Sequence, residues 1–254
     1  MDQSNFNNYR DGEKKYFEDI ESYFKESSGG YGEKMHSFCR DIPRQALGHF
    51  LARNEIFKEI IDVHGSICDF GVYRGSSFFA WQQLSSIYEP YNHTRKVIGF
   101  DSFDGFSNIG EFDENPSEET VALKTCGGMA FSGEDEIRRG VDLIDLNRPL
   151  GHMTKGSIVT DALPESFDTY LVDHPETTIS LANLGLGLYG PTVELMKQIK
   201  PRLTKGSIVV LEEANQAMWP GETKALNEVF GLNNIALNRL PYCPQISWFK
   251  WEGR

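Results

Sequence analysis

Residues 66–77 read SICDFGVYRGSS, and this stretch decides the fold. Ser66–Val72 has the length and the apolar content of a buried strand. Gly71 and Gly75 then allow a tight turn with a close backbone approach. A helix, predicted over Ser76–Ser86, follows at once. A strand that passes through such a turn directly into a helix is typical of the first unit of an α/β sheet.

The start of this helix is a candidate anion site. Ser76 or Ser77 can cap the helix, whose free backbone N–H groups attract negative charge. The glycine spacing is not GxGxxG, so the pyrophosphate of a dinucleotide is not the natural ligand. A smaller carboxylate, such as that of an amino acid, fits the helix end. The alternative is a plain strand-to-helix turn that binds nothing.

The rest of the chain alternates short apolar strands with helical segments, which indicates a parallel sheet with helices on both faces. The further predicted strands are Lys96–Phe103, Ser157–Asp161, Ile179–Leu186, Ser207–Glu212, Ile235–Leu240 and Ile246–Trp251. The further predicted helices are Glu134–Asp145, Pro164–Asp173, Pro191–Lys200 and Thr223–Phe230. Only Pro241–Gln245 join the last two strands, and so short a link cannot make a parallel crossover. The predicted fold class is therefore α/β, with a mostly parallel seven-stranded sheet that ends in an antiparallel C-terminal hairpin.

Helical segments precede the sheet. The first carries an apolar stripe and ends in the glycine-rich residues 27–32; the stripe consists of Tyr16, Phe17, Ile20, Tyr23 and Phe24. A stripe that wide needs a partner surface. We therefore expect an N-terminal helical segment, residues 1–62, that makes lid or subunit contacts in a homo-oligomer, and a ligand-binding domain over residues 63–254. The long polar stretch 104–133 is typical of a lid or a binding loop.

Composition excludes several classes of partner. The chain has 254 residues and a formal net charge of -12, whereas nucleic acids and anionic membranes require a basic surface. The polar N-terminus has no secretion signal, and no apolar run has the length of a membrane span. The four cysteines form no CxxC pair and indicate free thiols in a reducing compartment; they are Cys39, Cys68, Cys126 and Cys243. We expect a cytoplasmic protein with no nucleic-acid or membrane partner.

The ends of three consecutive strands carry chemistry that fits one ligand. Gly71–Ser77 offers a site for a carboxylate, and Asp101 after the second strand can accept hydrogen bonds from both hydroxyls of a ribose. Asp161 after the third strand can accept a hydrogen bond from an adenine amino group. Each acid alone could equally be a surface charge or a helix cap. Together they describe S-adenosylmethionine, which has an amino-acid end, a ribose and an adenine.

Four motifs give the chain a specific resemblance. They are DFGVYRGSS (69–77), GFDSFDGF (99–106), LYGPT (188–192) and EEANQAMWPGET (212–223). In this order and spacing they resemble the macrocin O-methyltransferase family, over a region from about Arg40 to the C-terminus. The resemblance implies a Rossmann-like class I methyltransferase that uses S-adenosylmethionine to methylate a sugar hydroxyl, in natural-product or polysaccharide pathways.

The resemblance and the strand-end chemistry together give the candidate cofactor-binding residues. They are Arg44, Asp69, Gly71, Val72, Tyr73, Arg74, Gly75, Ser76, Ser77, Asp101, Ser102, Phe103, Asp104, Gly105, Ser132, Asp161 and Ala162.

The chain departs from the family in the stretch LGLGLYG, residues 184–190. Sequences that resemble this family carry acids there, in a form like LDLDLYEPT, of which the first helps to hold a divalent metal and the second can serve as general base. Here the three acidic positions are Gly185, Gly187 and Gly190, which have no side-chain oxygen. We expect that any transfer activity depends less on Mg²⁺ than the resemblance implies, and that Gly185→Asp with Gly187→Asp raises metal affinity.

Two acids remain as candidates for catalysis and for metal binding, Glu212 and Glu213. Neighbouring residues of a strand point to opposite faces, so both can face one site only if the strand has already ended. Mg²⁺ prefers six oxygen ligands in near-octahedral geometry, and two glutamates could hold it only weakly. The turn that follows, Trp219–Glu222, is either an active-site rim on which a sugar stacks or a plain helix start.

Three functional hypotheses follow from these patterns. The first is an active S-adenosylmethionine-dependent O-methyltransferase that acts on a sugar hydroxyl, in a nucleotide sugar, a glycoside or a natural-product sugar. The second is a catalytically impaired protein of the same fold that binds the cofactor but lacks the strand-four acids. The third, a nicotinamide oxidoreductase, is disfavoured by the missing GxGxxG motif and by the antiparallel C-terminal pair.

Overall fold

The computed structural model describes residues 11–107, 109–113 and 124–253, and the chain divides into two compact units, residues 1–49 and 50–254. The first unit contains α1 (Asp11–Glu26), α2 (Tyr31–His36), the 3-10 turn η2 (Phe38–Arg40) and the beginning of α3 (Arg44–Lys58). None of its described side chains is buried. The described part of the first unit, residues 11–49, therefore has no hydrophobic core of its own.

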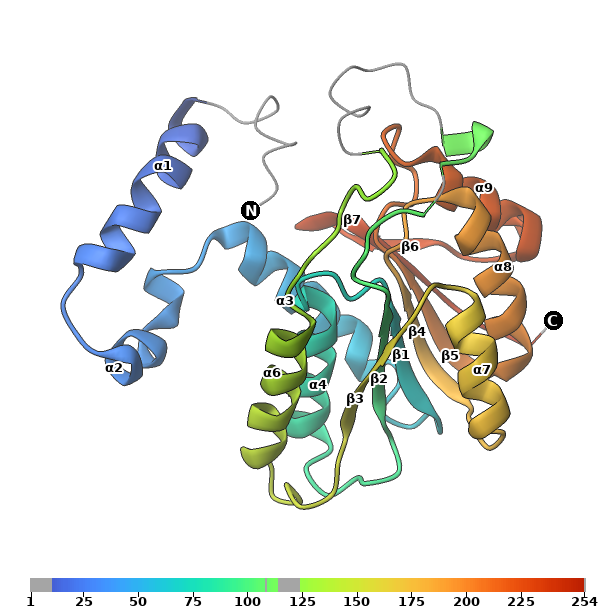
Figure 1. Ribbon diagram of the computed structural model, residues 1–254, viewed down its shortest axis with the longest axis horizontal. Coiled ribbons are helices and arrows are strands. Elements are labelled where there is room, and N and C mark those ends of the chain that lie inside the picture. The colour runs from blue at the N-terminus through green and yellow to red at the C-terminus, as the bar shows by residue number, and fades with distance from the viewer. Residues whose placement is uncertain (1–10, 108, 114–123, 254) are drawn as a thin grey trace. The chain divides into compact units, whose positions relative to one another are not determined.

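The second unit is built on a seven-stranded sheet with the order β3-β2-β1-β4-β5-β7-β6 (Figure 1). The strands are β1 (Ser66–Phe70), β2 (Val97–Asp101), β3 (Gly156–Thr160), β4 (Ile179–Leu184), β5 (Leu203–Leu211), β6 (Asn238–Leu240) and β7 (Cys243–Lys250). The first five pair in parallel, whereas β7 pairs antiparallel with both β5 and β6. The order reverses direction between β1 and β4, and ligands bind at such switch points.

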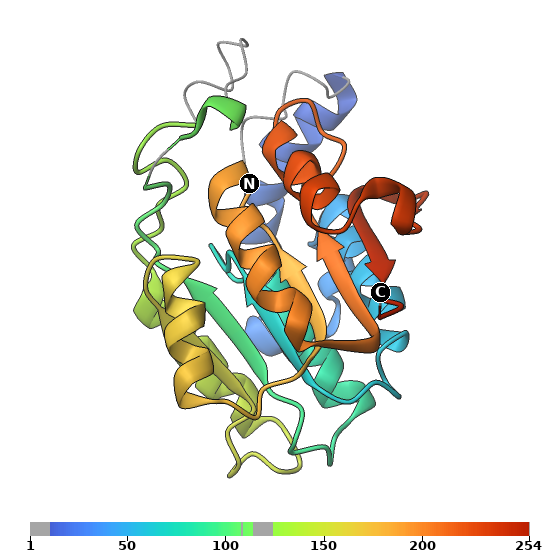
Figure 2. The same ribbon diagram turned by 90° about the vertical axis from the view of Figure 1, so that its right-hand side faces the viewer.

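Helices cover both faces of this sheet (Figures 1 and 2). One face carries α4 (Ser76–Tyr88), α6 (Glu134–Leu146) and the second half of α3, and the other carries α7 (Glu165–Asp173), α8 (Tyr189–Ile199) and α9 (Pro220–Val229). Short 3-10 turns complete the unit: η3 (Glu111–Asp113), η4 (Lys200–Arg202) and η5 (Leu232–Asn234). Each face has its own apolar cluster, with Phe70 and Phe100 in one and Trp81 and Ile208 in the other.

The predicted fold class is confirmed, while several element boundaries differ. The fourth strand ends at Leu184 rather than Leu186, so Gly185 and Gly187 lie beyond it. The fifth strand begins at Leu203, four residues earlier than its apolar run, because Gly206 and Trp251 continue the backbone pairing. The hairpin link is shorter than expected, since β7 already begins at Cys243.

Candidate active site

The carboxyl ends of the five parallel strands, with the segments that follow them, surround one cavity. It contains about 880 Å³ of space free of protein atoms, counted out to its mouth. Seven of the predicted site residues line it: Gly71, Tyr73, Asp101, Ser102, Gly105, Ala162 and Glu213. The geometry therefore brings together the three strand ends that the sequence assigned to one ligand, and adds one acid from the end of β5.

The turn after β1 needs its two glycines because its backbone is left-handed and closely packed. Gly71 has φ +91°, and a Cβ atom there would overlap the carbonyl oxygen of Gly185. Gly75 has φ +85° and precedes the first turn of α4, and a Cβ atom there would overlap the Phe79 ring. An L-residue with a side chain rarely adopts either conformation. Gly71 thus lines the cavity a few residues before the N-terminus of α4, where backbone N–H groups favour a negative charge.

Asp101 connects the first two strand ends. Its two carboxylate oxygens accept the backbone N–H groups of Tyr73 (2.6 Å) and Phe103 (2.7 Å). Burial raises the pKa of this carboxyl group, and the backbone hydrogen bonds oppose the rise. A carboxylate offers about four lone-pair positions, so acceptor capacity remains for the hydroxyls of a ribose.

Backbone strain gathers around the same cavity. Tyr73 (φ +49°), Phe103 (φ +59°) and Met129 (φ +61°) are left-handed although none is glycine. Tyr73 and Met129 line the cavity, and Phe103 follows the cavity residue Ser102. Such conformations cost about 1–3 kcal/mol each and concentrate at functional sites. This observation supports the assignment of the cavity as the active site.

The remaining predicted cofactor residues are not part of the cavity lining. Asp69, Val72, Gly75, Ser77 and Phe103 are buried behind it. Arg74, Ser76, Asp104, Ser132 and Asp161 are exposed, and Arg44 belongs to the first unit, where it pairs with Glu13 (2.5 Å). Cofactor contacts for all of these residues stay predictions.

Sequence reasoning missed much of the lining because most of it is apolar. The further lining residues are Phe106, Ser107, Met129, Leu163, Gly185, Leu186, Gly187, Leu188, Pro191 and Trp219. Apart from the glycines and Trp219, their only sequence signal is their position directly after a strand or within the long loop. Such positions carry no chemical signature.

Glu212 and Glu213 face different surroundings. Because β5 ends at Leu211, the two acids lie beyond the strand. The alternation of strand side chains therefore does not force them to opposite faces of the sheet. Glu213 lines the cavity. Glu212 instead forms an ion pair with the buried Arg53, at 2.6 Å between Oε1 and Nη2. The structure thus separates the two candidates, and Glu213 is the one that a bound substrate would meet.

A buried polar network lies behind the cavity. Asp69 is completely buried and accepts hydrogen bonds from Ser77 Oγ (2.7 Å) and Asn183 Nδ2 (2.6 Å). The same amide nitrogen also lies 3.2 Å from Glu212 Oε1. Burial raises the pKa of Asp69 to about 7. The helix cap predicted at Ser76 or Ser77 is therefore wrong, because Gly75 is the N-cap residue of α4 and the Ser77 hydroxyl donates to Asp69 instead.

Glu222 supports Glu213 from the first turn of α9. It is completely buried, and its Oε2 accepts the backbone N–H of Glu213 at 2.6 Å. Burial, followed by the charge of Glu212, raises the pKa of Glu213 to about 8. Burial, followed by the charge of Glu213, raises the pKa of Glu222 well above its ordinary value. The helix start expected at Glu222 is confirmed, since this acid lies in the first turn of α9, and its buried side chain also holds the loop after β5.

The acids at this end of the sheet do not fit a Mg²⁺ ion. Oε1 of Glu212 already faces two N–H donors, from Arg53 and Asn183. Within the described ranges, no three His, Cys, Asp or Glu side chains are grouped as metal ligands. Mg²⁺ requires oxygen ligands rather than donors. The predicted metal site at Glu212 and Glu213 is thus not supported by the donor set.

The three glycines that replace the family's acids differ in their surroundings. At Gly187 (φ +67°) a Cβ atom would lie 2.8 Å from the Trp219 ring, which is too close. At Gly185 the nearest atoms would be the oxygens of Gly71 (3.6 Å) and Phe70 (3.7 Å) and then Glu212 Cγ (3.9 Å), which are ordinary contacts. At Gly190 nothing lies within 4 Å. Only Gly185 and Gly190 have room for a side chain, so the expected double replacement would displace Trp219.

The sheet order, the switch-point cavity and the Gly71–Asp101 arrangement define a class I S-adenosylmethionine-dependent methyltransferase. Residues 36–236 match the macrocin O-methyltransferase (TylF) family, and the chain belongs to this family. The resemblance found in the motifs is thereby confirmed. A comparison with curated protein sequences gave no match.

Solved structures agree with this assignment. The chain is similar to CalS11, a calicheamicin methyltransferase, with 28% identity over 96% of this chain and 94% of that one and a TM-score of 0.89. It is also similar to the apo structure of CalS11, described as a TDP-rhamnose 3'-O-methyltransferase, with 27% identity, 96% of each chain covered and a TM-score of 0.81. The O-methyltransferase NovP shares the fold, with 20% identity, 81% and 80% coverage and a TM-score of 0.60.

Proposed function

We propose that this S-adenosylmethionine-dependent O-methyltransferase methylates a hydroxyl group of a sugar, carried by a nucleotide, a glycoside or a natural product. The observation that carries the proposal is the cavity at the ends of β1 to β5, in a chain of the macrocin O-methyltransferase family. The similarity to CalS11, whose described substrate is TDP-rhamnose, supports a nucleotide-linked sugar as the first class to test.

The cofactor side of the cavity follows from the strand ends. When bound, S-adenosylmethionine supplies a methyl group on a positively charged sulfur for in-line displacement, a reaction in which positioning provides much of the catalysis. We assign its amino-acid end to the Gly71–Gly75 turn, its ribose to Asp101 and its adenine to the region of Ala162. Leu163 and Met129 add apolar side chains to the lining of the cavity.

The acceptor side lies at the end of β5. Trp219 lines the cavity, with the Phe106 ring 5.8 Å away and Lys124 Nζ 4.7 Å from its own ring centre. An indole face of this kind suits the apolar face of a sugar. Glu213 lines the same cavity. We propose that its carboxylate acts as the general base and accepts the proton of the acceptor hydroxyl.

A second candidate, a cofactor-binding protein with impaired catalysis, is favoured by one observation. The pKa of Glu213 is raised to about 8, so at neutral pH this carboxyl group is largely protonated and accepts a proton poorly. Gly185 and Gly187 supply no replacement base. An active enzyme would then depend on substrate binding or on higher pH to ionise Glu213.

A panel of nucleotide sugars, incubated with methyl-labelled cofactor, tests both candidates. We expect label in at least one sugar, with transfer lost in Glu213→Gln and kept in Asp135→Asn, which changes an exposed acid of α6. Calorimetry with S-adenosylhomocysteine runs in parallel. Normal cofactor binding with no transfer to any nucleotide sugar, glycoside or aglycone-linked sugar would favour the impaired protein instead.

We also propose a cytoplasmic location, a homo-oligomeric state and a division of labour between residues 1–62 and 63–254. Four free cysteines, of which Cys39 and Cys126 are exposed, support a reducing compartment. Across the described part of the chain, no helix has the length and hydrophobicity to cross a membrane.

A further inference from the structure

A buried guanidinium group lies among the acids behind the cavity. Arg53 is 2% exposed, and its Nη2 lies 2.6 Å from Oε1 of Glu212. The charge of Arg53 also acts on Asp69 and on Glu213. One fixed positive charge therefore interacts electrostatically with three carboxyl groups, which come from the ends of β1 and β5.

The core of the protein fixes the position of this charge. Arg53 belongs to α3, and its neighbours Ala52, Ile56 and Phe57 are completely buried in the apolar cluster on that face of the sheet. The guanidinium group cannot move away without disturbing this packing. The guanidinium group is thus a fixed part of the site, unlike a mobile surface side chain.

Other donors complete the surroundings of the acids. Asn183 presents its amide N–H₂ to both Asp69 (2.6 Å) and Glu212 (3.2 Å), and Ser77 donates to the second oxygen of Asp69 (2.7 Å). These carboxyl groups therefore face hydrogen-bond donors within the protein. A hard cation would have to displace the donors and would meet the repulsion of Arg53.

We propose that Arg53 is the resident cation of this acid cluster, defined as Asp69, Glu212 and Glu213, and that it keeps divalent metal ions out of the site. Arg53 is then a positioning residue, which holds Glu212 away from the substrate and leaves Glu213 to face the cavity. This inference deepens the proposed function, but its test reads metal binding and needs no methyl acceptor.

The glycine at position 185 completes the exclusion. A Cβ atom at Gly185 would lie 3.9 Å from Glu212 Cγ, so an aspartate there would place new oxygens beside that acid. The lack of carboxylate oxygens at position 185 and the positive charge of Arg53 both weaken the binding of a divalent metal ion. A metal site should therefore appear only when both are changed, by Gly185→Asp together with the loss of the Arg53 charge.

Mn²⁺, which carboxylates bind readily, is the probe, and electron paramagnetic resonance measures its free concentration. We expect no saturable binding in the parent protein, and almost none in Gly185→Asp. The double variant Arg53→Gln with Gly185→Asp should gain one saturable Mn²⁺ site, with an affinity about tenfold or more above any binding by Gly185→Asp. Arg53→Lys with Gly185→Asp is the matched control, because it keeps the charge and should not gain the site.

Two results would overturn the proposal. One is stoichiometric Mn²⁺ binding by the parent that Mg²⁺ displaces. The other is binding by Gly185→Asp alone that equals the binding of the double variant. Binding of S-adenosylhomocysteine, measured on every variant, shows that the fold is intact, and the parent result stands even if a variant at Arg53 fails to fold. Failure of sugar methylation would leave these metal measurements unchanged.

Discussion

Asp101 lies at the end of β2 and lines the cavity, so its role in cofactor binding can be tested directly. We predict that Asp101→Asn weakens the binding of S-adenosylmethionine by about 10- to 100-fold, because hydrogen bonds to a charged group contribute about 1.5–3 kcal/mol. The amide also cannot accept both backbone N–H groups that now hold the turns after β1 and β2. Isothermal titration calorimetry measures the change.

Asp135→Asn is the matched control, since Asp135 is an exposed acid of α6 that lies outside the cavity lining. We expect its affinity to stay within about twofold of the parent. An unchanged affinity in a folded Asp101→Asn would remove Asp101 from the site. An equal loss in both variants would mean that the effect comes from the lost negative charge and not from the position of the Asp101 carboxylate.

The glycines after β4 give a second prediction at this scale. Gly187→Ala should destabilise the protein by about 1–3 kcal/mol, because the left-handed conformation disfavours a side chain and the new methyl group would press on Trp219. Gly190→Ala should have the opposite sign, about 0.5–1 kcal/mol of stabilisation, because Gly190 lies in α8 with open space around it. Urea unfolding, followed by tryptophan fluorescence, compares the two. Equal effects would contradict the assigned role of Gly187.

At the residue scale, site residues that lie at the ends of strands could be predicted from the sequence. Site residues that come from segments far away in the chain could not. Gly71 and Asp101 follow apolar strands, so their place at one sheet edge was predictable. Arg53 pairs with an acid 159 residues away, and no local pattern indicates such a pair. Glu222 was correctly predicted at a helix start, but its hydrogen bond with the backbone N–H of Glu213 depends on packing that no local pattern indicates.

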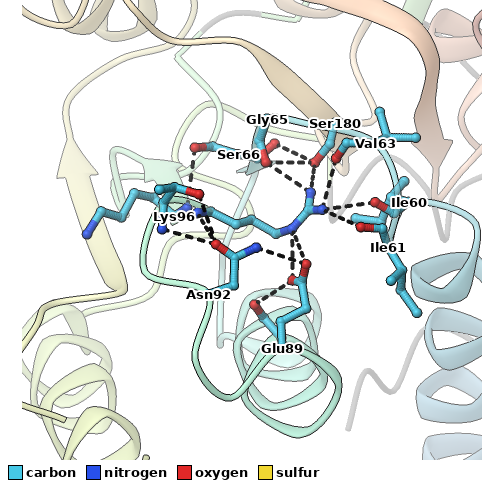
Figure 3. A network of polar contacts seen from close by, with 12 residues as sticks. Ile60, Ile61, Val63, Gly65, Ser66, Glu89, Asn92, Lys96 and Ser180 are labelled. Carbon is cyan, nitrogen blue, oxygen red and sulfur yellow. Dashed lines mark hydrogen bonds and ion pairs between the residues drawn. The ribbon is translucent and has the colours of Figure 1, made fainter. Parts of the chain in front are cut away.

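Among the elements, one buried arginine, Arg95, joins several segments at the end of the sheet where β1 and β4 begin, and Figure 3 shows the groups around its guanidinium. Arg95 is 3% exposed; it donates to the carbonyl groups of Ile60 (2.9 Å), Val63 (2.9 Å) and Gly65 (2.9 Å). It also donates to Ser180 Oγ and forms an ion pair with the buried Glu89 at 2.8 Å. This side chain fixes the end of α3 and the starts of β1 and β4 to the segment that leads into β2.

We predict that Arg95→Met destabilises the protein by about 3–5 kcal/mol, because it leaves the buried Glu89 charge without its partner. The carbonyl groups of the network would also lose their donor. Urea unfolding measures the change. Lys197→Met is the control, since its pair with Glu194 is exposed and should contribute less than about 1 kcal/mol. Similar losses in both variants would show that the Arg95 network adds nothing beyond a surface ion pair.

The start of β3 carries a prediction about pH. Lys155 is 2% exposed, and burial lowers its pKa to about 8. Neighbouring charges act on it as well: Glu89 raises the pKa, while Arg148, Arg95 and Lys96 lower it. Between pH 8 and the ordinary lysine pKa of 10.5, the unfolded chain holds this proton and the folded protein has released it. The free energy of unfolding therefore gains from this group as pH rises through that window.

Lys155→Met removes this contribution. Relative to the parent, we expect the variant to lose the rise in unfolding free energy between pH 8 and 10.5, while below pH 8 the difference between the two proteins stays constant. Urea unfolding at several pH values measures both curves, and their difference cancels the other titrating groups. Parallel curves across the window would show that Lys155 titrates at its ordinary pKa.

The elements themselves were largely predictable, and their ends were not. Each of the seven predicted strands exists, because apolar runs between breakers dictate buried strands. The ends of β4 and β5 differed because backbone pairing, rather than hydrophobicity, decides where a strand stops. Leu203 joins β5 ahead of polar residues that pair with the chain after β7, and Leu186 leaves β4 because Gly187 turns the backbone.

On the scale of the whole molecule, the first unit poses the main physical problem. Its described side chains between residues 12 and 49 include no buried residue. Several large apolar groups are exposed there: Tyr16 (38%), Tyr23 (46%), Phe24 (39%), Tyr31 (82%) and Phe38 (43%). Helices that bury nothing gain little from packing and are marginal in water. Of the stripe predicted from the sequence, Tyr16, Tyr23 and Phe24 thus stay exposed, whereas Phe17 and Ile20 are half-buried.

We predict that a second copy of the chain covers this stripe, so that the protein is a homo-oligomer. A variant with Tyr16→Glu and Tyr23→Glu places two charges on one face of α1, and it should dissociate into monomers. Glu18→Ala, an exposed polar position of the same helix, should leave the assembly unchanged. Light scattering after size-exclusion chromatography, at micromolar concentration, measures the mass of each protein. A monomeric parent would contradict the prediction, and an oligomeric double variant would place the subunit contact elsewhere on the molecule.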